Sequence, residues 1–177
     1  KVRQEVEEVL ASGHQLYVIC ASIERNEQFH ARSVQDIAKS LQVLFQDRYI
    51  VAALHGSLPA AEREKVMQNF ADGQVDVLVS TTVVEVGVNV PNATGMIIYD
   101  ADRFGLSQLH QLRGRIQRGN TQGICWLLTA SKDEQVAKRL DVLVRSHNGF
   151  EISWWDLRLR GPGDILGTKQ SGLPDFT

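Results

Sequence analysis

The chain has 177 residues, of which 43% are hydrophobic and 23% are charged, ordinary proportions for a soluble globular protein. This length can bury a hydrophobic core and predicts one domain with room for an appendage. The formal net charge of -2 excludes nucleic-acid binding through bulk positive charge, so any such contact must come from local clusters.

No apolar run approaches the roughly 20 residues that a membrane span needs, and no signal peptide is present. The two cysteines, Cys20 and Cys125, lie in apolar runs and are expected to be buried free thiols. We therefore predict a cytosolic protein that does not contact membranes. The chain opens on a lysine within a helical pattern, so we expect it to be a piece of a longer protein.

Five short apolar runs predict the buried strands of a mostly parallel sheet. They are continuous and rich in β-branched residues, as strands covered on both faces tend to be. Helical patterns lie between several of them, which predicts an α/β domain with helices flanking the sheet. The expected strands are 15–20, 49–54, 75–80, 95–100 and 123–128, and the expected helices are 2–11, 33–45 and 59–73.

Three details refine this pattern. In the third helix, Pro59 suits the first turn and Gly73 can close the last one. The polar segment 24–32 is expected to be a loop. After residue 130 a further helix is expected to open with a capping box formed by Ser131 and Glu134.

The predicted organisation has two parts. Residues 1–130 form the α/β domain, and residues 131–177 form a helical hairpin followed by an ordered tail. The tail contains Trp154 and Trp155 and is dense in glycine and arginine.

Polar, glycine-bearing segments follow three of the strands. Because ligands of an open parallel sheet bind beyond the carboxyl ends of its strands, these segments predict a composite site. Gly56 and Gly87 allow backbone N–H groups to approach a phosphate, and Thr81 and Thr82 add hydroxyls. His55 could act in the same way. Simple capping of the strand ends by the threonines, and a structural role for the histidine, remain open.

An arginine cluster lies in "QLHQLRGRIQRG", residues 108–119. If this segment is helical, Arg115 and Arg118 share one face, and two guanidinium groups on one face suit a triphosphate supplied from outside. The alternative is a solvated helix face with salt bridges. It is weakened because the segment contains no acidic residue.

The sequence contains no P-loop, the motif that cradles the phosphates of ATP. The nearest stretch, residues 161–172, has the wrong glycine spacing and follows no predicted strand. Asp100 and Asp102 could mimic a magnesium-binding pair, but turn-forming aspartates are the favoured interpretation, and no metal ligand is assigned.

Two stretches, "TTVVEVGVNVP" and "QLHQLRGRIQRG", resemble motifs V and VI of superfamily 2 helicases. Within that superfamily, "DADRFGLSQLHQLRGR" and the tail "GFEISWWDLRLRGPGDILGTKQSGLPDF" are similar to the RecG family of branched-DNA helicases. The resemblance covers nearly the whole chain. The transcription-repair coupling factor Mfd has a related tail, but "RGPGD" and "QSGLPDF" resemble the RecG family.

The resemblance implies a RecA-like second motor domain with a translocation element behind it, acting in the bacterial cytosol. The first motor domain, which would hold ATP and Mg²⁺, and the wedge domain would be partners within the same protein. The implied substrate is branched duplex DNA, namely forks and Holliday junctions.

The resemblance also implies roles for individual residues. Arg115 and Arg118 would reach ATP held by the first motor domain, with Arg118 as the arginine finger and Gln111 as its polar partner. Glu85, Gly87 and Asn89 would sense the nucleotide, although the superfamily pattern prefers aspartate at position 89. The residues implied in DNA contact are His55, Gly56, Thr81 and Thr82 in the motor domain and Arg160 and Gln170 in the tail.

Three alternatives remain open at the level of sequence. The chain could belong to an Mfd-like duplex translocase. It could be a small phosphohydrolase that uses Asp100 and Asp102 with magnesium, or a non-catalytic module that binds DNA or a protein.

Overall fold

The computed structural model describes residues 2–20, 27–81, 90–116, 123–129 and 131–145. These residues separate into two compact units, each described by itself. The sheet unit comprises residues 1–100 and 113–128, and the helical unit comprises residues 101–112 and those from 129 onward.

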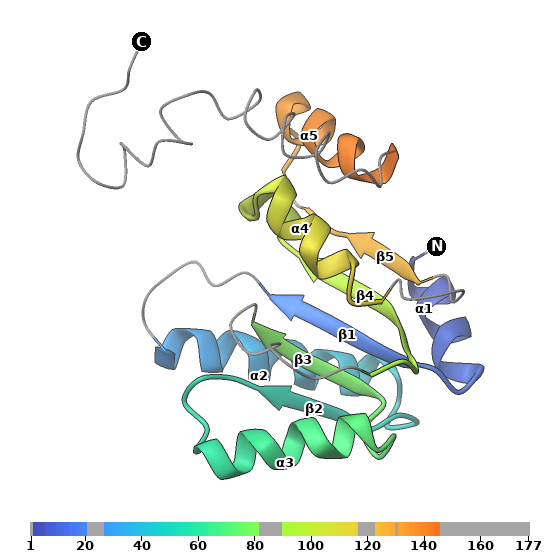
Figure 1. Cartoon of the computed structure of the whole chain (residues 1–177), viewed down its shortest axis with the longest axis vertical. Coiled ribbons are helices and arrows are strands. Elements are labelled where there is room, and N and C mark those ends of the chain that lie inside the picture. The colour runs from blue at the N-terminus through green and yellow to red at the C-terminus, as the bar shows by residue number, and fades with distance from the viewer. Residues whose placement is uncertain (1, 21–26, 82–89, 117–122, 130, 146–177) are drawn as a thin grey trace. The chain divides into compact units, whose positions relative to one another are not determined.

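The sheet unit contains five parallel strands in the order β2-β3-β1-β4-β5, which confirms the predicted α/β class (Figure 1). All five predicted strands are present. In chain order its elements are α1 (Val2–Ala11), β1 (Gln15–Cys20), α2 (Glu27–Leu44), β2 (Val51–Leu54), α3 (Ala60–Ala71), β3 (Val77–Thr81), β4 (Ala93–Tyr99) and β5 (Ile124–Leu127).

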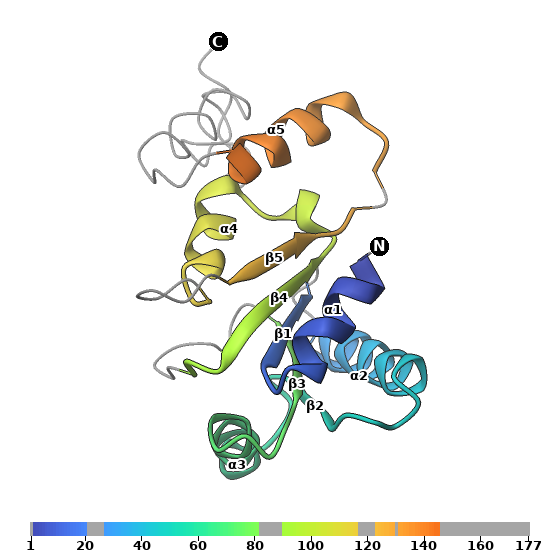
Figure 2. The same cartoon turned by 90° about the vertical axis from the view of Figure 1, so that its right-hand side faces the viewer.

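Helices cover both faces of this sheet. Helices α1 and α2 lie against one face, where alternate residues of the strands form the main hydrophobic core with them (Figure 2). Helix α3 covers the other face, where Phe70 meets Tyr17 in an edge-to-face contact with ring centroids 5.0 Å apart. The fully buried members of the main core include Leu16, Val18, Val34, Phe45, Val77 and Val79.

Helix α3 ends as its sequence predicts. Pro59 immediately precedes the helix as its N-cap residue, and Gly73 follows the last turn with a φ of 82°. That φ lies in the left-handed region, where a Cβ is disfavoured and glycine carries no such cost.

Helix α2 begins earlier than its hydrophobic pattern suggests. The prediction of a loop over 24–32 is wrong from Glu27 onward, because the helix spans Glu27–Leu44. The segment 27–32 reads "EQFHAR" and is rich in residues with good helix propensity. Its polarity was therefore a poor indicator of a loop.

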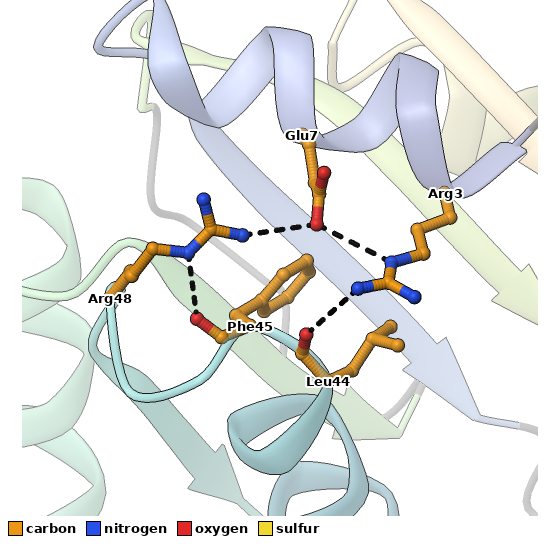
Figure 3. Close-up of polar contacts among 5 residues, drawn as sticks. All are labelled: Arg3, Glu7, Leu44, Phe45 and Arg48. Carbon is orange, nitrogen blue, oxygen red and sulfur yellow. Dashed lines mark hydrogen bonds and ion pairs between the residues drawn. The ribbon is translucent and has the colours of Figure 1, made fainter.

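A polar cluster on the surface joins α1 to the end of α2 (Figure 3). The Glu7 carboxylate pairs with Arg3 at 3.4 Å and with Arg48 at 3.1 Å. The same arginines donate to carbonyl groups at the end of α2, Arg3 to Leu44 O at 3.4 Å and Arg48 to Phe45 O at 3.0 Å. Cations are favourable at a helix C-terminus, but each exposed pair contributes only about 0–1 kcal/mol.

The described part of the helical unit contains the short helix η2 (Ala101–Arg103), α4 (Leu106–Arg113, whose last residue lies in the sheet unit) and α5 (Glu134–Arg145). The predicted capping box of α5 is wrong. Asp133 is the N-cap, because its Oδ1 accepts from the N–H of Gln135 at 2.9 Å, while Ser131 Oγ accepts from Asp133 N one step earlier. In the part of the chain that is described, we find no helix with the length and apolar character of a membrane span.

Candidate functional site

The carboxyl ends of the strands bring together two of the predicted DNA-contacting segments. Leu54 of β2 pairs with Ser80 of β3, so His55 follows at the level of Thr81, the last residue of β3. Because the strands are parallel and adjacent, these residues meet at one edge of the sheet.

The side chains at this edge differ in exposure. His55 and Thr81 are each 5% exposed, whereas Gly56 is exposed to solvent. His55 Nε2 lies 3.5 Å from Gln35 Nε2, and its Nδ1 has no hydrogen-bond partner among the described residues. Burial lowers the pKa of His55, so the ring is neutral at physiological pH. The turn is closed by the backbone, since Leu58 N–H donates to His55 O at 3.2 Å, and Gly56 within it is exposed to solvent.

The arginine segment does not form the continuous helix on which the sequence argument relied. Helix α4 ends at Arg113, and residues 114–116 form a turn. Gly114 follows the last helical residue directly, as glycine commonly does at a helix end. Arg115 therefore projects from a turn rather than from a helix face.

The surroundings of Arg115 lie within the sheet unit. Its partly buried side chain lines a small pocket over the α3 face of the sheet. The other lining residues are Tyr17, Ile19, Leu54, Met67, Leu78, Ser80 and Met96. Arg115 therefore borders this pocket together with side chains of β1, β2, β3, β4 and α3.

Arg113 has different surroundings from Arg115. It is only 6% exposed, and burial lowers its pKa while the Cys125 thiol on β5 acts in the opposite direction. Burial also raises the pKa of Cys125 to about 12, against a smaller lowering by Arg113. The guanidinium of Arg113 therefore lies near Cys125 of β5, and its burial limits its access to an external phosphate.

Of the remaining predicted site residues, the structure describes one and does not describe the others. Gln111 is exposed on α4. The others lie outside the described residues, namely Thr82, Glu85, Gly87, Asn89, Arg118, Arg160 and Gln170.

The two aspartates considered as a magnesium pair lie close together in the chain in structured backbone, Asp100 in a turn and Asp102 in η2. Asp100 has a φ of 52°, a left-handed conformation that aspartate tolerates better than most residues. Asp102 Oδ1 accepts from Thr129 Oγ1 at 2.6 Å, and its backbone oxygen accepts from Arg139. Across the described residues there is no cluster of three or more histidine, cysteine or acidic side chains that could hold a metal ion.

One residue at this site was missed by the sequence argument. Gly123 lies so close to Ile116 that a Cβ built on it would be 2.4 Å from the Ile116 carbonyl oxygen. The available signal was a glycine immediately before the last predicted strand, which is too common to single out.

Comparison with known proteins defines the class. The model of the helicase conserved C-terminal domain matches residues 1–120, and the chain belongs to this family. It is 49% identical over 171 residues to the ATP-dependent DNA helicase RecG of Bacillus subtilis, covering 97% of this chain and 25% of that protein. It is 52% identical over 178 residues to RecG of Staphylococcus aureus strain Mu50, covering 99% of this chain and 26% of that protein.

Solved structures agree with this assignment. A structure of RecG bound to a three-way DNA junction matches with a TM-score of 0.75 and 37% identity, covering 99% of this chain and 22% of that one. The helicase MrfA bound to DNA matches with a TM-score of 0.62 at 18% identity, covering 82% of this chain and 20% of that one, which supports the fold alone. The predicted resemblance to the RecG family is confirmed, and the chain spans about a quarter of the length of its curated relatives.

Proposed function

We propose that this chain is the second motor domain of an ATP-dependent helicase that remodels branched DNA, namely replication forks and Holliday junctions, in the bacterial cytosol. The observation that carries the proposal is its similarity to RecG over 97–99% of its length. A structure of RecG on a three-way DNA junction, similar over 99% of this chain, supports branched DNA as the substrate.

In this proposal the chain supplies half of an ATPase site. Residues 1–130 form the motor domain, and residues 131–177 form a helical hairpin and a tail that couples closure to movement along duplex DNA. The first motor domain holds ATP and Mg²⁺, and a wedge domain of the same protein opens the fork. The lack of a P-loop, the turn position of Asp100 and the hydrogen bonds that Thr129 and Arg139 donate to Asp102 support this division of labour.

The arginines act on the phosphates of ATP. Arg118 is the finger that stabilises charge on the transferred phosphoryl group, with Arg115 beside it and Gln111 as a polar partner. Guanidinium groups suit this task because they stay charged and pair with two phosphate oxygens at once. In other phosphoryl-transfer enzymes such a finger contributes about 10³–10⁵ in rate. Glu85, Gly87 and Asn89 sense the nucleotide.

The carboxyl edge of the sheet contacts the DNA backbone. The exposed N–H of Gly56 and the hydroxyls of Thr81 and Thr82 bind phosphate, and His55 supports the turn. The adjacency of His55 and Thr81 at the ends of β2 and β3 supports this assignment. Arg160 and Gln170 extend the contact from the tail.

The test is fork-stimulated ATP hydrolysis by the complete protein, wild type against Arg118→Ala, with fork binding measured alongside. We expect turnover to fall by a hundredfold or more, equivalent to about 2.7 kcal/mol, with fork binding intact. Arg48→Ala is the matched control, because it removes the same charge from an exposed pair with Glu7 and should leave turnover unchanged. Wild-type turnover in Arg118→Ala would refute the proposal.

A further inference from the structure

The approach of Gly123 to Ile116 leaves no room for a side chain. A Cβ at position 123 would lie 2.4 Å from Ile116 O, 2.8 Å from Ile116 C and 2.9 Å from Ile116 Cβ. Two of these atoms belong to the backbone, so no rotamer change can relieve the contact. The φ of Gly123 is outside the left-handed region, so an alanine could adopt its conformation. Glycine is needed here for space alone.

The segment on the other side of this contact carries Arg115. Ile116 directly follows Arg115, is 3% exposed, and donates its N–H to Arg113 O at 3.2 Å. Arg113 is itself buried beside Cys125 of β5. The turn is therefore fixed to β5 near both of its ends, by Arg113 near Cys125 and by Ile116 against Gly123.

Strand β5 makes a firm base for this turn. It pairs in parallel with β4 from Gly95↔Ile124 to Ile98↔Leu127, and Trp126 Nε1 donates to Glu5 Oε2 of α1 at 2.7 Å. A methyl group at position 123 therefore displaces the turn and not the strand. The Ile116 carbonyl oxygen would have to retreat by about 1 Å to reach an ordinary contact distance.

We propose that Gly123 is a positioning residue for Arg115: its missing side chain lets the turn that carries Arg115 seat against the start of β5. This inference rests on the proposed function, in which Arg115 acts on ATP held by another domain. A reacting group misplaced by about 1 Å can cost about a hundredfold in rate. The displacement predicted here is of that size, so we expect kcat to fall by about a hundredfold.

The experiment compares Gly123→Ala with wild type in the complete protein. Fork-stimulated ATP hydrolysis gives kcat and KM for ATP, and fork binding and thermal unfolding are measured on the same samples. We expect kcat to fall while KM and fork affinity hold, because the first motor domain holds ATP, and the displaced arginine acts on the charge that develops in the transition state. Wild-type kcat in Gly123→Ala would overturn the inference.

A matched control separates positioning from a general loss of stability. In Gly73→Ala the new Cβ meets no atom within 4 Å, and the cost comes from a φ of 82° after the last turn of α3, which belongs neither to the arginine turn nor to β5. This variant should lose thermal stability and keep its kcat below its unfolding temperature. If Gly123→Ala fails to fold while Gly73→Ala folds, Gly123 is structural and the inference is overturned.

A double-mutant cycle with Arg115→Ala tests the route of the effect. If Gly123 acts through Arg115, adding Gly123→Ala to Arg115→Ala lowers kcat little further, whereas independent effects multiply and overturn the inference. The cycle also distinguishes the two proposals. Wild-type turnover in Arg115→Ala would count against the proposed function itself, whereas loss in Arg115→Ala with wild-type turnover in Gly123→Ala would remove the inference alone.

Discussion

Replacing the buried Gln15 by leucine should lower the free energy of unfolding of the sheet unit more than the same replacement at an exposed glutamine. Gln15 is 3% exposed and donates from Nε2 to Phe70 O at 2.5 Å and to Val75 O at 2.7 Å. Leucine removes both donors. Phe70 O still accepts a hydrogen bond from the N–H of Gly73 at 3.1 Å. Val75 O, in contrast, loses the hydrogen bond from the Gln15 side chain.

The magnitude follows from these bonds. An unsatisfied buried carbonyl costs about 1–3 kcal/mol and the other lost bond about 1 kcal/mol, so we expect a loss of about 2–4 kcal/mol. For a chain of this size that corresponds to a fall in Tm of roughly 4–16 °C. Urea denaturation of wild type and Gln15→Leu measures it, with Gln68→Leu as control, because Gln68 bonds only to Asp72 on the surface. A loss below about 1 kcal/mol, or an equal loss in the control, would refute the reasoning.

Two further predictions concern α5 and the thiols. Asp133→Ala should cost about 0.5–2 kcal/mol and speed amide exchange in the first turn of α5, and a larger loss in Ser131→Ala would contradict the N-cap assignment. Burial raises the pKa of Cys20 and of Cys125 from 9.0 to about 12. Between pH 9 and 12 the unfolded chain loses the thiol protons that the folded chain keeps. The contribution of these thiols to the free energy of unfolding is therefore fully present below pH 9 and is lost as the pH rises toward 12. Urea midpoints from pH 7 to 11 should fall less steeply in the Cys20→Ala, Cys125→Ala double variant, and equal slopes would contradict this account.

The sheet was predictable because its signal is continuous in the sequence. A buried parallel strand needs an unbroken apolar run, and each of the five runs became a strand within two residues of its expected ends. The adjacency of His55 and Thr81 also followed, since parallel strands place their carboxyl ends at one edge. Helix starts were harder. Glu27 and Asp133 depend on propensity and on single hydrogen bonds, which hydrophobic periodicity does not record.

The details of the site were not predictable, for a different reason. The sequence pattern treats Arg113, Arg115 and Arg118 as equivalent members of a charged cluster. Whether an arginine is buried depends on where the helix ends and on which strand lies behind it. Both depend on residues outside the arginine segment. The contact of Gly123 with Ile116 likewise depends on how β5 meets a turn seven residues earlier in the chain.

The arrangement of the cluster explains why a nearly neutral chain concentrates arginines in one short segment. Burying a guanidinium carries a desolvation cost that an apolar side chain would avoid, so Arg113 contributes little net stability for its charge. What it supplies is a fixed point on β5, two residues before Arg115. In the function proposed above, a finger that must meet a phosphate held by another domain gains rate only if its position is set before the domains close, because ordering it at that moment would cost free energy. An anchored arginine followed by a seated turn meets this requirement within the sheet unit.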